Sequence, residues 1–289
     1  MSTHATFDNI NNAKAEMGHI YDQDDPIAYF RELNKLGYVI PARAKPIFQK
    51  LISHLQTLRD PTIRLLDIGC SYGVNAALLK YDLSMSELYD HWDEQAVADN
   101  ASGDIVAYNR DFLDTLTKHD DLSVVGLDVA ESAVAFAEKV GLLDEAHAVN
   151  LETQQLPDAA QEHLAPVDLV ISTGCVGYVT EQSFECLMPA VTQGRSPWMA
   201  NFVLRMFSFD AIDEALQGWG YVTEKLEGQT FLQRNFASDQ EQEQLLEQLR
   251  MRGIDPTGQE SEGQLVAEFY LSRPANDAAA MPIERLLAT

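Results

Sequence analysis

Residues 65–80 read LLDIGCSYGVNAALLK, a pattern that predicts a strand ending near Asp67, a turn, and a helix beginning after Gly73. Gly69 and Gly73 lack the β carbon that would keep a ligand away from the backbone, and the helix N-terminus behind them presents unpaired N–H groups. The turn therefore predicts a site for a polar ligand. A dinucleotide fingerprint needs the spacing G-x-G-x-x-G, so the two-residue spacing of Gly69, Ser71 and Gly73 weakens a pyrophosphate-binding interpretation.

Short apolar runs alternate with helical patterns from Pro61 onward. Continuous apolar strands that alternate with helices indicate a parallel sheet buried on both faces, and ligands bind outside the carboxyl ends of such strands. The predicted strands are IRLLDI at 63–68, SVVGLD at 123–128, HAVNL at 147–151, VDLVIS at 167–172 and WMANFVLRMF at 198–207. We therefore expect an α/β fold that is doubly wound around a mostly parallel sheet.

Helical patterns precede the first predicted strand. Asp25-Pro26 followed by IAYFRELNKLG predicts a helix with an N-cap, a proline at its first position and a glycine at its end. After Pro41, apolar residues recur at three- and four-residue steps, which is typical of an amphipathic helix that covers a core. We expect residues 1–59 to form an N-terminal helical cap. Residues 81–120, which are too long for a single crossover helix, are expected to add a helical insertion.

The C-terminal part is expected to complete the sheet. YVTEKL at 221–226 and TFLQRNF at 230–236 flank a glycine like the strands of a hairpin, and LVAEFYLS at 265–272 predicts a last strand. Residues 60–274 are thus expected to form one domain. An alanine-rich, loosely ordered tail is expected at 275–289.

The charge of the chain limits its partners. Twenty Lys and Arg against 45 Asp and Glu give a net charge of −25, which repels nucleic acid and anionic lipid. No apolar stretch reaches the roughly 18 residues of a membrane span, and no signal peptide is evident, so we expect a cytoplasmic protein without a membrane partner. Three cysteines without CxxC spacing and seven scattered histidines predict reduced thiols and no bound metal.

A second signal follows the next predicted strand. Asp128 closes the run SVVGLD, and a helix is expected from about Glu131. A carboxylate at this position accepts two hydrogen bonds from a ribose diol and disfavours a 2′-phosphate. The ligand is therefore expected to carry a ribose, with the insertion accounting for the long gap between Gly73 and Asp128.

These segments together resemble the class I S-adenosylmethionine-dependent methyltransferases. DIGCSYG is similar to the first motif of that family, LDVAESAVAFAEK to the second, VNLETQQLP to the third-strand segment and VDLVISTGCVGYV to the fourth. Four motifs in the right order on alternating strands make this resemblance specific over residues 60–205. It implies a seven-stranded, Rossmann-like sheet whose last strand is antiparallel, with S-adenosyl-L-methionine as cofactor and S-adenosyl-L-homocysteine as product.

The resemblance also assigns cofactor contacts. In that family the glycine turn lies against the methionine and ribose, the second-strand acid binds the ribose hydroxyls, and third-strand residues border the adenine. The cofactor-binding residues that it implies are Asp67, Gly69, Cys70, Ser71, Gly73, Asp128, Val129, Asn150, Leu151, Glu152, Thr173 and Gly174. Ser71 departs from the family pattern, in which glycine is commoner at that place.

Few catalytic groups are expected, because displacement at a sulfonium depends mainly on holding donor and acceptor in line. His19 is the candidate general base, and Tyr21 and Tyr178 are candidate hydrogen-bonding groups. A packing role in the cap or the turn is the alternative for each. The substrate-binding candidates are Tyr29, Tyr38, Cys175, Tyr178 and Arg205. Arg205 either clamps an anionic substrate group or pairs with one of the many carboxylates.

These features predict a methyltransferase that acts on a small-molecule acceptor, because the charge disfavours nucleic acid and a cap with an insertion can enclose a pocket. A protein acceptor with a basic motif and a homodimer stay open. The alternative enzyme is a nicotinamide-dependent oxidoreductase on a similar sheet. The alternative outside enzymes is a non-catalytic cofactor-binding or scaffold protein.

Overall fold

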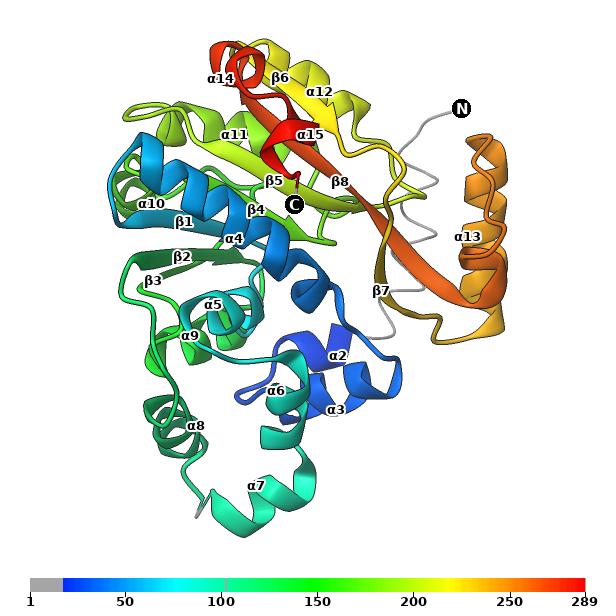
Figure 1. The fold of residues 1–289 in the computed structure, drawn as a ribbon. Helices are drawn as coiled ribbons and strands as arrows, with labels where there is room; N and C mark the ends of the chain where they lie inside the picture. The colour runs from blue at the N-terminus through cyan, green and yellow to red at the C-terminus, as the bar shows by residue number, and fades with distance from the viewer. Residues whose placement is uncertain (1–17, 102, 289) are drawn as a thin grey trace.

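Parallel strands rich in Leu, Val and Ile form the centre of a sheet with helices on both faces (Figure 1). The computed structural model describes residues 18–101 and 103–288. The five parallel strands are β1 (Ile63–Ile68), β2 (Leu122–Asp128), β3 (Glu145–Ala148), β4 (Leu169–Thr173) and β5 (Trp198–Leu204). Strands β1, β4 and β5 are almost wholly buried, as expected for strands covered on both faces.

The strand order confirms the predicted fold class. The sheet runs β3-β2-β1-β4-β5-β8-β6, and the last strand, β8 (Gln264–Pro274), is antiparallel to β5. This path is the expected seven-stranded, mostly parallel sheet. An eighth strand, β7 (Phe231–Asn235), pairs with β8 outside that path.

Strands β6 (Tyr221–Lys225) and β7 do not form the predicted hairpin, so that prediction is wrong. Both run antiparallel to β8 along the edge opposite β5, because Ser272 pairs with Met199 on one side and Thr223 on the other. The 11-residue β8 is long enough to take β6 on its C-terminal half and β7 on its N-terminal half. The two predicted strands are therefore consecutive parts of one sheet edge.

Helices fill both faces of the sheet. On one face α4 (Ile40–Leu58) contacts β1, β4 and β7, and α9 contacts β2 and β3. On the other face α10, α11 and α12 pack in sequence. The remaining bounds are α5 (Val74–Lys80), α9 (Glu131–Lys139), α10 (Asp158–Leu164), α11 (Glu181–Val191), α12 (Asp210–Gln217), α13 (Asp239–Met251), η1 (Glu260–Glu262), α14 (Ala275–Ala280) and α15 (Ile283–Leu286).

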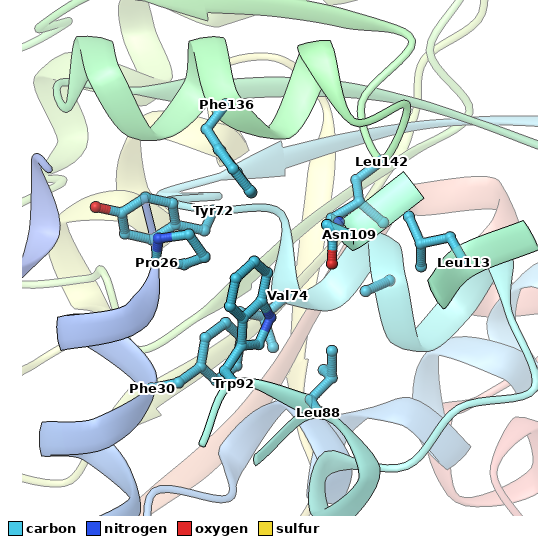
Figure 2. A pocket seen from close by; sticks show the side chains of 11 residues that line it. Pro26, Phe30, Tyr72, Val74, Leu88, Trp92, Asn109, Leu113, Phe136 and Leu142 are labelled. Carbon is cyan, nitrogen blue, oxygen red and sulfur yellow. The ribbon is translucent and has the colours of Figure 1, made fainter. Parts of the chain in front are cut away.

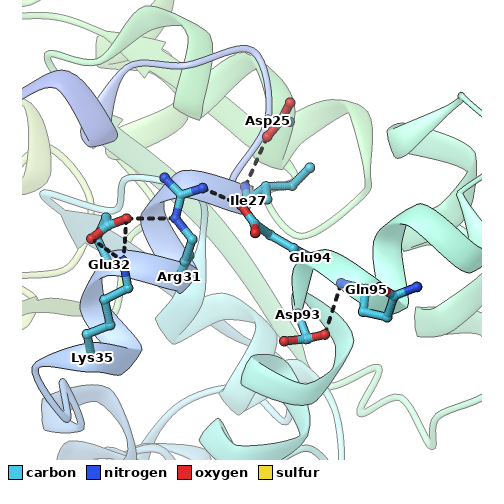
Figure 3. A network of polar contacts seen from close by, with 8 residues as sticks. All are labelled: Asp25, Ile27, Arg31, Glu32, Lys35, Asp93, Glu94 and Gln95. Carbon is cyan, nitrogen blue, oxygen red and sulfur yellow. Dashed lines mark hydrogen bonds and ion pairs between the residues drawn. The ribbon is translucent and has the colours of Figure 1, made fainter.

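Short helices form the two segments that cover the carboxyl end of β1. Before α4 lie α2 (Gly18–Tyr21) and α3 (Ile27–Lys35). Between α5 and β2 lie α6 (Met85–His91), α7 (Glu94–Asn100) and α8 (Ile105–Asp114), each capped by a polar side chain just before it. An exposed polar network joins the two segments where Arg31 pairs with Glu94 (Figure 3). Exposed pairs of this kind contribute about 0–1 kcal/mol, so apolar packing provides most of the attachment.

An aromatic cavity lies between these segments and α9 (Figure 2). Its volume is about 10 Å³, room for about one water molecule, because Phe30, Trp92 and Phe136 fill the space. The Asn109 side chain lines the cavity, and its amide nitrogen is buried without a hydrogen-bond partner. The cavity is too small to hold a methyl acceptor.

The C-terminal tail is not loosely ordered, contrary to expectation. It forms α14 and α15, which attach to the sheet through polar contacts. The Trp198 indole N–H donates to Asp277 over 2.8 Å, and the Ile283 N–H donates to Glu224 over 2.9 Å. Among the described residues, no helix has the length and apolar character needed to span a membrane.

Gly126 provides a test of the core packing. A β carbon on this β2 residue would lie 2.5 Å from Leu143 Cδ1 and 2.7 Å from Cys70 Sγ. We expect Gly126→Ala to lower the free energy of unfolding by about 1–3 kcal/mol, because both neighbours must shift. Urea denaturation measures this, with Ser123→Ala on the same strand as the control. A stability equal to that of the unmodified protein would contradict this packing.

Candidate functional site

The turn between β1 and α5 has a positive φ at three positions. Gly69, Ser71 and Gly73 have φ angles of 71°, 47° and 75°, and Ser71 is the one non-glycine residue with a positive φ in the described part of the chain. A non-glycine residue in this conformation costs of order 1–3 kcal/mol and persists only where its surroundings hold it. The Ser71 N–H donates to Asp128 Oδ2 over 2.8 Å, and this bond fixes the turn.

Asp128 joins the turns that follow β1 and β2. Its Oδ2 accepts from Ser71, and its Oδ1 accepts from the Ala130 N–H over 3.0 Å. Burial raises the pKa of the Asp128 carboxyl, while these backbone N–H groups lower it. Both oxygens accept backbone hydrogen bonds, and a carboxylate with about four lone-pair sites still has one for a ligand hydroxyl. Val129 between them is 64% exposed, at the mouth of the site.

A β carbon on either glycine of the turn would meet other parts of the protein. A β carbon on Gly69 would lie 2.7 Å from Cys175 Cβ, and one on Gly73 would lie 3.2 Å from both Ala137 and Leu142. The loop after β4 thus packs directly on the loop after β1. Cys175 strengthens this contact, because its thiol donates to the Ile68 carbonyl over 3.3 Å.

A buried polar group joins β1 to β4. The Asn75 amide nitrogen donates to Asp67 Oδ1 over 3.1 Å and to Thr173 Oγ1 over 3.1 Å. Asp67 is fully buried, and burial raises the pKa of its carboxyl to about 7. The sequence reasoning missed Asn75, although its position in the first turn of the helix after the glycines was a usable signal.

The N-terminal segment is attached to the glycine turn through Tyr72, which the sequence reasoning also missed. The Tyr72 hydroxyl donates to the Gln23 carbonyl over 3.0 Å and accepts from the Gln23 N–H over 2.9 Å. One residue earlier, Asp22 accepts from the Ser132 N–H at the start of α9 over 2.8 Å. The segment before α3 therefore lies across the carboxyl ends of β1 and β2.

Tyr21 lies among the charged groups of the site. Its ring packs edge-on against Tyr29 with centroids 5.5 Å apart. Burial raises the pKa of the Tyr21 hydroxyl, and Arg234 lowers it. The carboxylates of Asp128 and Glu241 raise the same pKa, so Tyr21 stands between the β2 turn and β7.

Tyr178 faces the same space from the loop after β4. It is 41% exposed, and burial followed by the proximity of Tyr21 raises the pKa of its hydroxyl. Tyr29 and Tyr38 are nearly buried, and burial raises the pKa of both hydroxyls. The structure thus brings these four tyrosines together at one edge of the sheet.

The residues after β3 are divided between surface, core and a helix terminus. Asn150 is exposed and Leu151 is buried. The Glu152 carboxylate accepts from the Thr180 N–H over 2.8 Å, the Thr180 hydroxyl over 2.7 Å and the Ser183 hydroxyl over 2.5 Å. Glu152 therefore stabilises the N-terminus of α11.

Two further predicted site residues, Arg205 and His19, are not among these tyrosines. Arg205 is buried in an ion pair with Glu260 at 3.1 Å, and its guanidinium also donates to the Asp255 carbonyl over 2.6 Å. Pairing within the protein, one of the two roles considered for it, is therefore present. His19 is in α2, and its side chain lies outside the described residues.

Three buried polar atoms at the carboxyl ends of the strands have no hydrogen-bond partner. They are the Ser71 hydroxyl oxygen, Asn75 Oδ1 and, from β7, Gln233 Oε1. A buried polar atom without a partner costs roughly 1–3 kcal/mol, so each such atom needs an explanation, and a bound ligand is one. These acceptors fit a ligand that carries N–H and O–H donors. The described residues include no group of three or more His, Cys, Asp or Glu that could hold a metal ion.

No protein-family model and no curated protein matches this sequence. Solved structures align with most of the chain at low identity. A TehB-like SAM-dependent methyltransferase from Corynebacterium glutamicum is 12% identical over 76% of this chain and 86% of that chain, with a TM-score of 0.37. Geranyl diphosphate methyltransferase in complex with SAM is 11% identical over 81% and 85%, with a TM-score of 0.40. Magnesium protoporphyrin IX methyltransferase from Synechocystis PCC 6803 is 10% identical over 79% and 78%, with a TM-score of 0.37.

Replacing Glu152 tests whether this side chain stabilises the fold. We expect Glu152→Ala to lower the free energy of unfolding by about 1–3 kcal/mol, because two hydroxyls and one N–H lose their acceptor. Chemical denaturation measures this, with Glu185→Ala on the exposed side of α11 expected to stay within about 0.5 kcal/mol. An unfolding free energy unchanged by Glu152→Ala would mean that these bonds contribute nothing to stability.

Proposed function

We propose that this protein transfers a methyl group from S-adenosylmethionine to a small-molecule acceptor. The observation that carries the proposal is the Asp128 carboxylate, which joins the turns after β1 and β2 and keeps lone pairs beside unpartnered buried acceptors. Ligands of doubly wound sheets bind at this edge of the strands. The sheet order and the antiparallel last strand agree with the family whose motifs the sequence resembles.

The residues present fit this cofactor. S-adenosylmethionine is a cation with hydroxyl and N–H donors, and the site offers oxygen acceptors and two acidic groups, Asp67 and Asp128. Asp128 would hold the ribose hydroxyls, and the Ser71 hydroxyl and Asn75 Oδ1 would accept donors of the same ligand. A site built for a dinucleotide would present N–H donors to a pyrophosphate, whereas the Ser71 N–H is already bonded to Asp128.

Positioning carries most of the catalysis in this proposal. When bound, the cofactor supplies a methyl group on a sulfonium that is already a good leaving group. The chain has to hold an acceptor in line with that methyl group and to exclude water, and Tyr21, Tyr29 and Tyr178 at the edge of the sheet are the side chains we propose for this role. Asp67, whose carboxyl has a pKa of about 7, adds a negative charge near neutral pH.

The net charge of the chain and the position of its N-terminal segment support a small-molecule acceptor. The net charge of −25 repels nucleic acid, and the segment that contains Asp22 and Gln23 crosses the site. The same charge favours a second candidate, a protein acceptor with a basic segment. We propose the small molecule, because the N-terminal segment lies across the strand ends, where a protein segment would have to bind.

Calorimetry with S-adenosylmethionine, S-adenosylhomocysteine and NAD tests the function. We expect micromolar binding of the first two and no binding of NAD. Asp128→Ala should weaken both affinities by about 1–3 kcal/mol, because the ribose loses its acceptor and Ser71 loses the bond that fixes it. Ser123→Ala is the control. Binding of NAD alone would favour the oxidoreductase, and no binding of any of the three would overturn the proposal.

The pKa of Asp67 predicts how cofactor affinity depends on pH. Below pH 7 the carboxyl is mostly neutral, and above it the carboxylate attracts a cationic ligand. If the bound cation lowers the pKa of Asp67 by about one, affinity for S-adenosylmethionine should rise about threefold to tenfold between about pH 5.5 and about pH 7.5, since a change of one in pKa corresponds to a factor of ten. Asp67→Asn should flatten this rise in the same calorimetric titrations. An equal rise in that variant would assign the pH dependence to another group.

A further inference from the structure

We infer that Gln233 binds the methyl acceptor by accepting a hydrogen bond from its N–H, so that the acceptor is a primary or secondary amine. This inference rests on the proposed function and deepens it. Gln233 lies on β7, the strand outside the seven-stranded path, and no motif of the sequence pointed to it.

The Gln233 amide lies against the residue that follows β4. A β carbon on Gly174 would lie 2.8 Å from Gln233 Nε2 and 2.9 Å from Oε1, and Gly174 has a φ of 90°. The amide therefore stands where a side chain of residue 174 would otherwise project. Asn75 and the thiol of Cys175 border the same loop. In the proposed function this loop faces the transferred methyl group.

A break in the β7 ladder directs this side chain. The register against β8 shifts between Leu232 and Arg234, which leaves Gln233 as the unpaired residue of the strand. Such bulges re-aim a side chain and are frequent beside active sites. The freed Gln233 carbonyl instead accepts from the Val39 N–H over 2.8 Å, just before α4. The side chain is thus held between the N-terminal segment and the β4 loop.

The amide oxygen has no partner within the protein. Gln233 is 7% exposed, and Oε1 is buried without a hydrogen bond. An amide carbonyl accepts a hydrogen bond but takes no proton at neutral pH. It therefore suits an acceptor that reacts without a base, and an amine nitrogen reacts through its own lone pair, whereas a hydroxyl needs early proton removal.

Methyl transfer to an amine needs no group beyond the cofactor, the amine, Gln233 and water. The amine reacts as its free base, so an ammonium group first loses a proton to water. Its lone pair then forms the bond to the methyl carbon, and the carbon–sulfur bond breaks with its electron pair on sulfur, which becomes a neutral thioether. The methylated nitrogen carries the positive charge and releases one proton to water. Gln233 orients the lone pair by holding an N–H of the same nitrogen.

Sinefungin tests this assignment without knowledge of the acceptor. This analogue carries a CH–NH₃⁺ group in place of the S⁺–CH₃ group, and so places N–H donors at the position of the transferred methyl, beside the place of the acceptor nitrogen. The ratio of its affinity to that of S-adenosylhomocysteine isolates this contact. We expect Gln233→Leu to lower the ratio about tenfold, as the loss of one hydrogen bond to a charged group implies. Affinity for S-adenosylhomocysteine itself should stay unchanged.

Two further variants keep the outcome clear. Gln233→Glu retains an oxygen acceptor and should keep or raise the ratio, and Gln217→Leu on the exposed face of α12 should leave it unchanged. If S-adenosylhomocysteine binds and Gln233→Leu leaves the ratio unchanged, or weakens both ligands equally, the acceptor contact is refuted while the proposed function stands. If the unmodified protein binds neither ligand, both fall. Thermal unfolding of each variant verifies that it folds.

Discussion

The Asp128 carboxylate accepts one backbone N–H from the turn after β1 and one from the turn after β2, and the geometry of the site depends on this pair of bonds. The bond from the Ser71 N–H holds that residue at its positive φ, in the turn that leads into α5. The same carboxylate keeps lone pairs directed outward. A single side chain thus stabilises the strained turn and presents the acceptor that the proposed ligand needs.

The other walls of the site depend on contacts that are distant in the chain. Tyr72 holds the backbone of Gln23, so the segment before α3 is attached to the glycine turn by the turn's own side chain. Cys175 packs on Gly69, which ties the β4 loop to the same turn. Both the N-terminal segment and the β4 loop therefore contact the glycine turn, so a movement of that segment would displace the turn.

Strand β7 is an addition to the seven-stranded path of this sheet. It extends the edge of β8 beyond β6, pairs through its backbone with the residues before α4, and brings Gln233 to Gly174. Burial of an unpartnered amide beside a tight loop costs stability, and a protein tolerates that cost where a ligand compensates for it. The side chain that we propose for the acceptor thus comes from an element outside the seven-stranded path of the sheet.

The sequence by itself determined the strand-turn-helix units, because hydrophobic periodicity and glycine positions act over a few neighbouring residues. It therefore located the turn at Gly69 to Gly73 and the acid at Asp128. Only the tertiary structure decided that β6 and β7 share one edge of β8, that Glu152 serves α11, and that Asn75 and Gln233 point at the β4 loop. Those outcomes depend on strand pairing and packing between segments far apart in the chain, for which no local pattern carries the information.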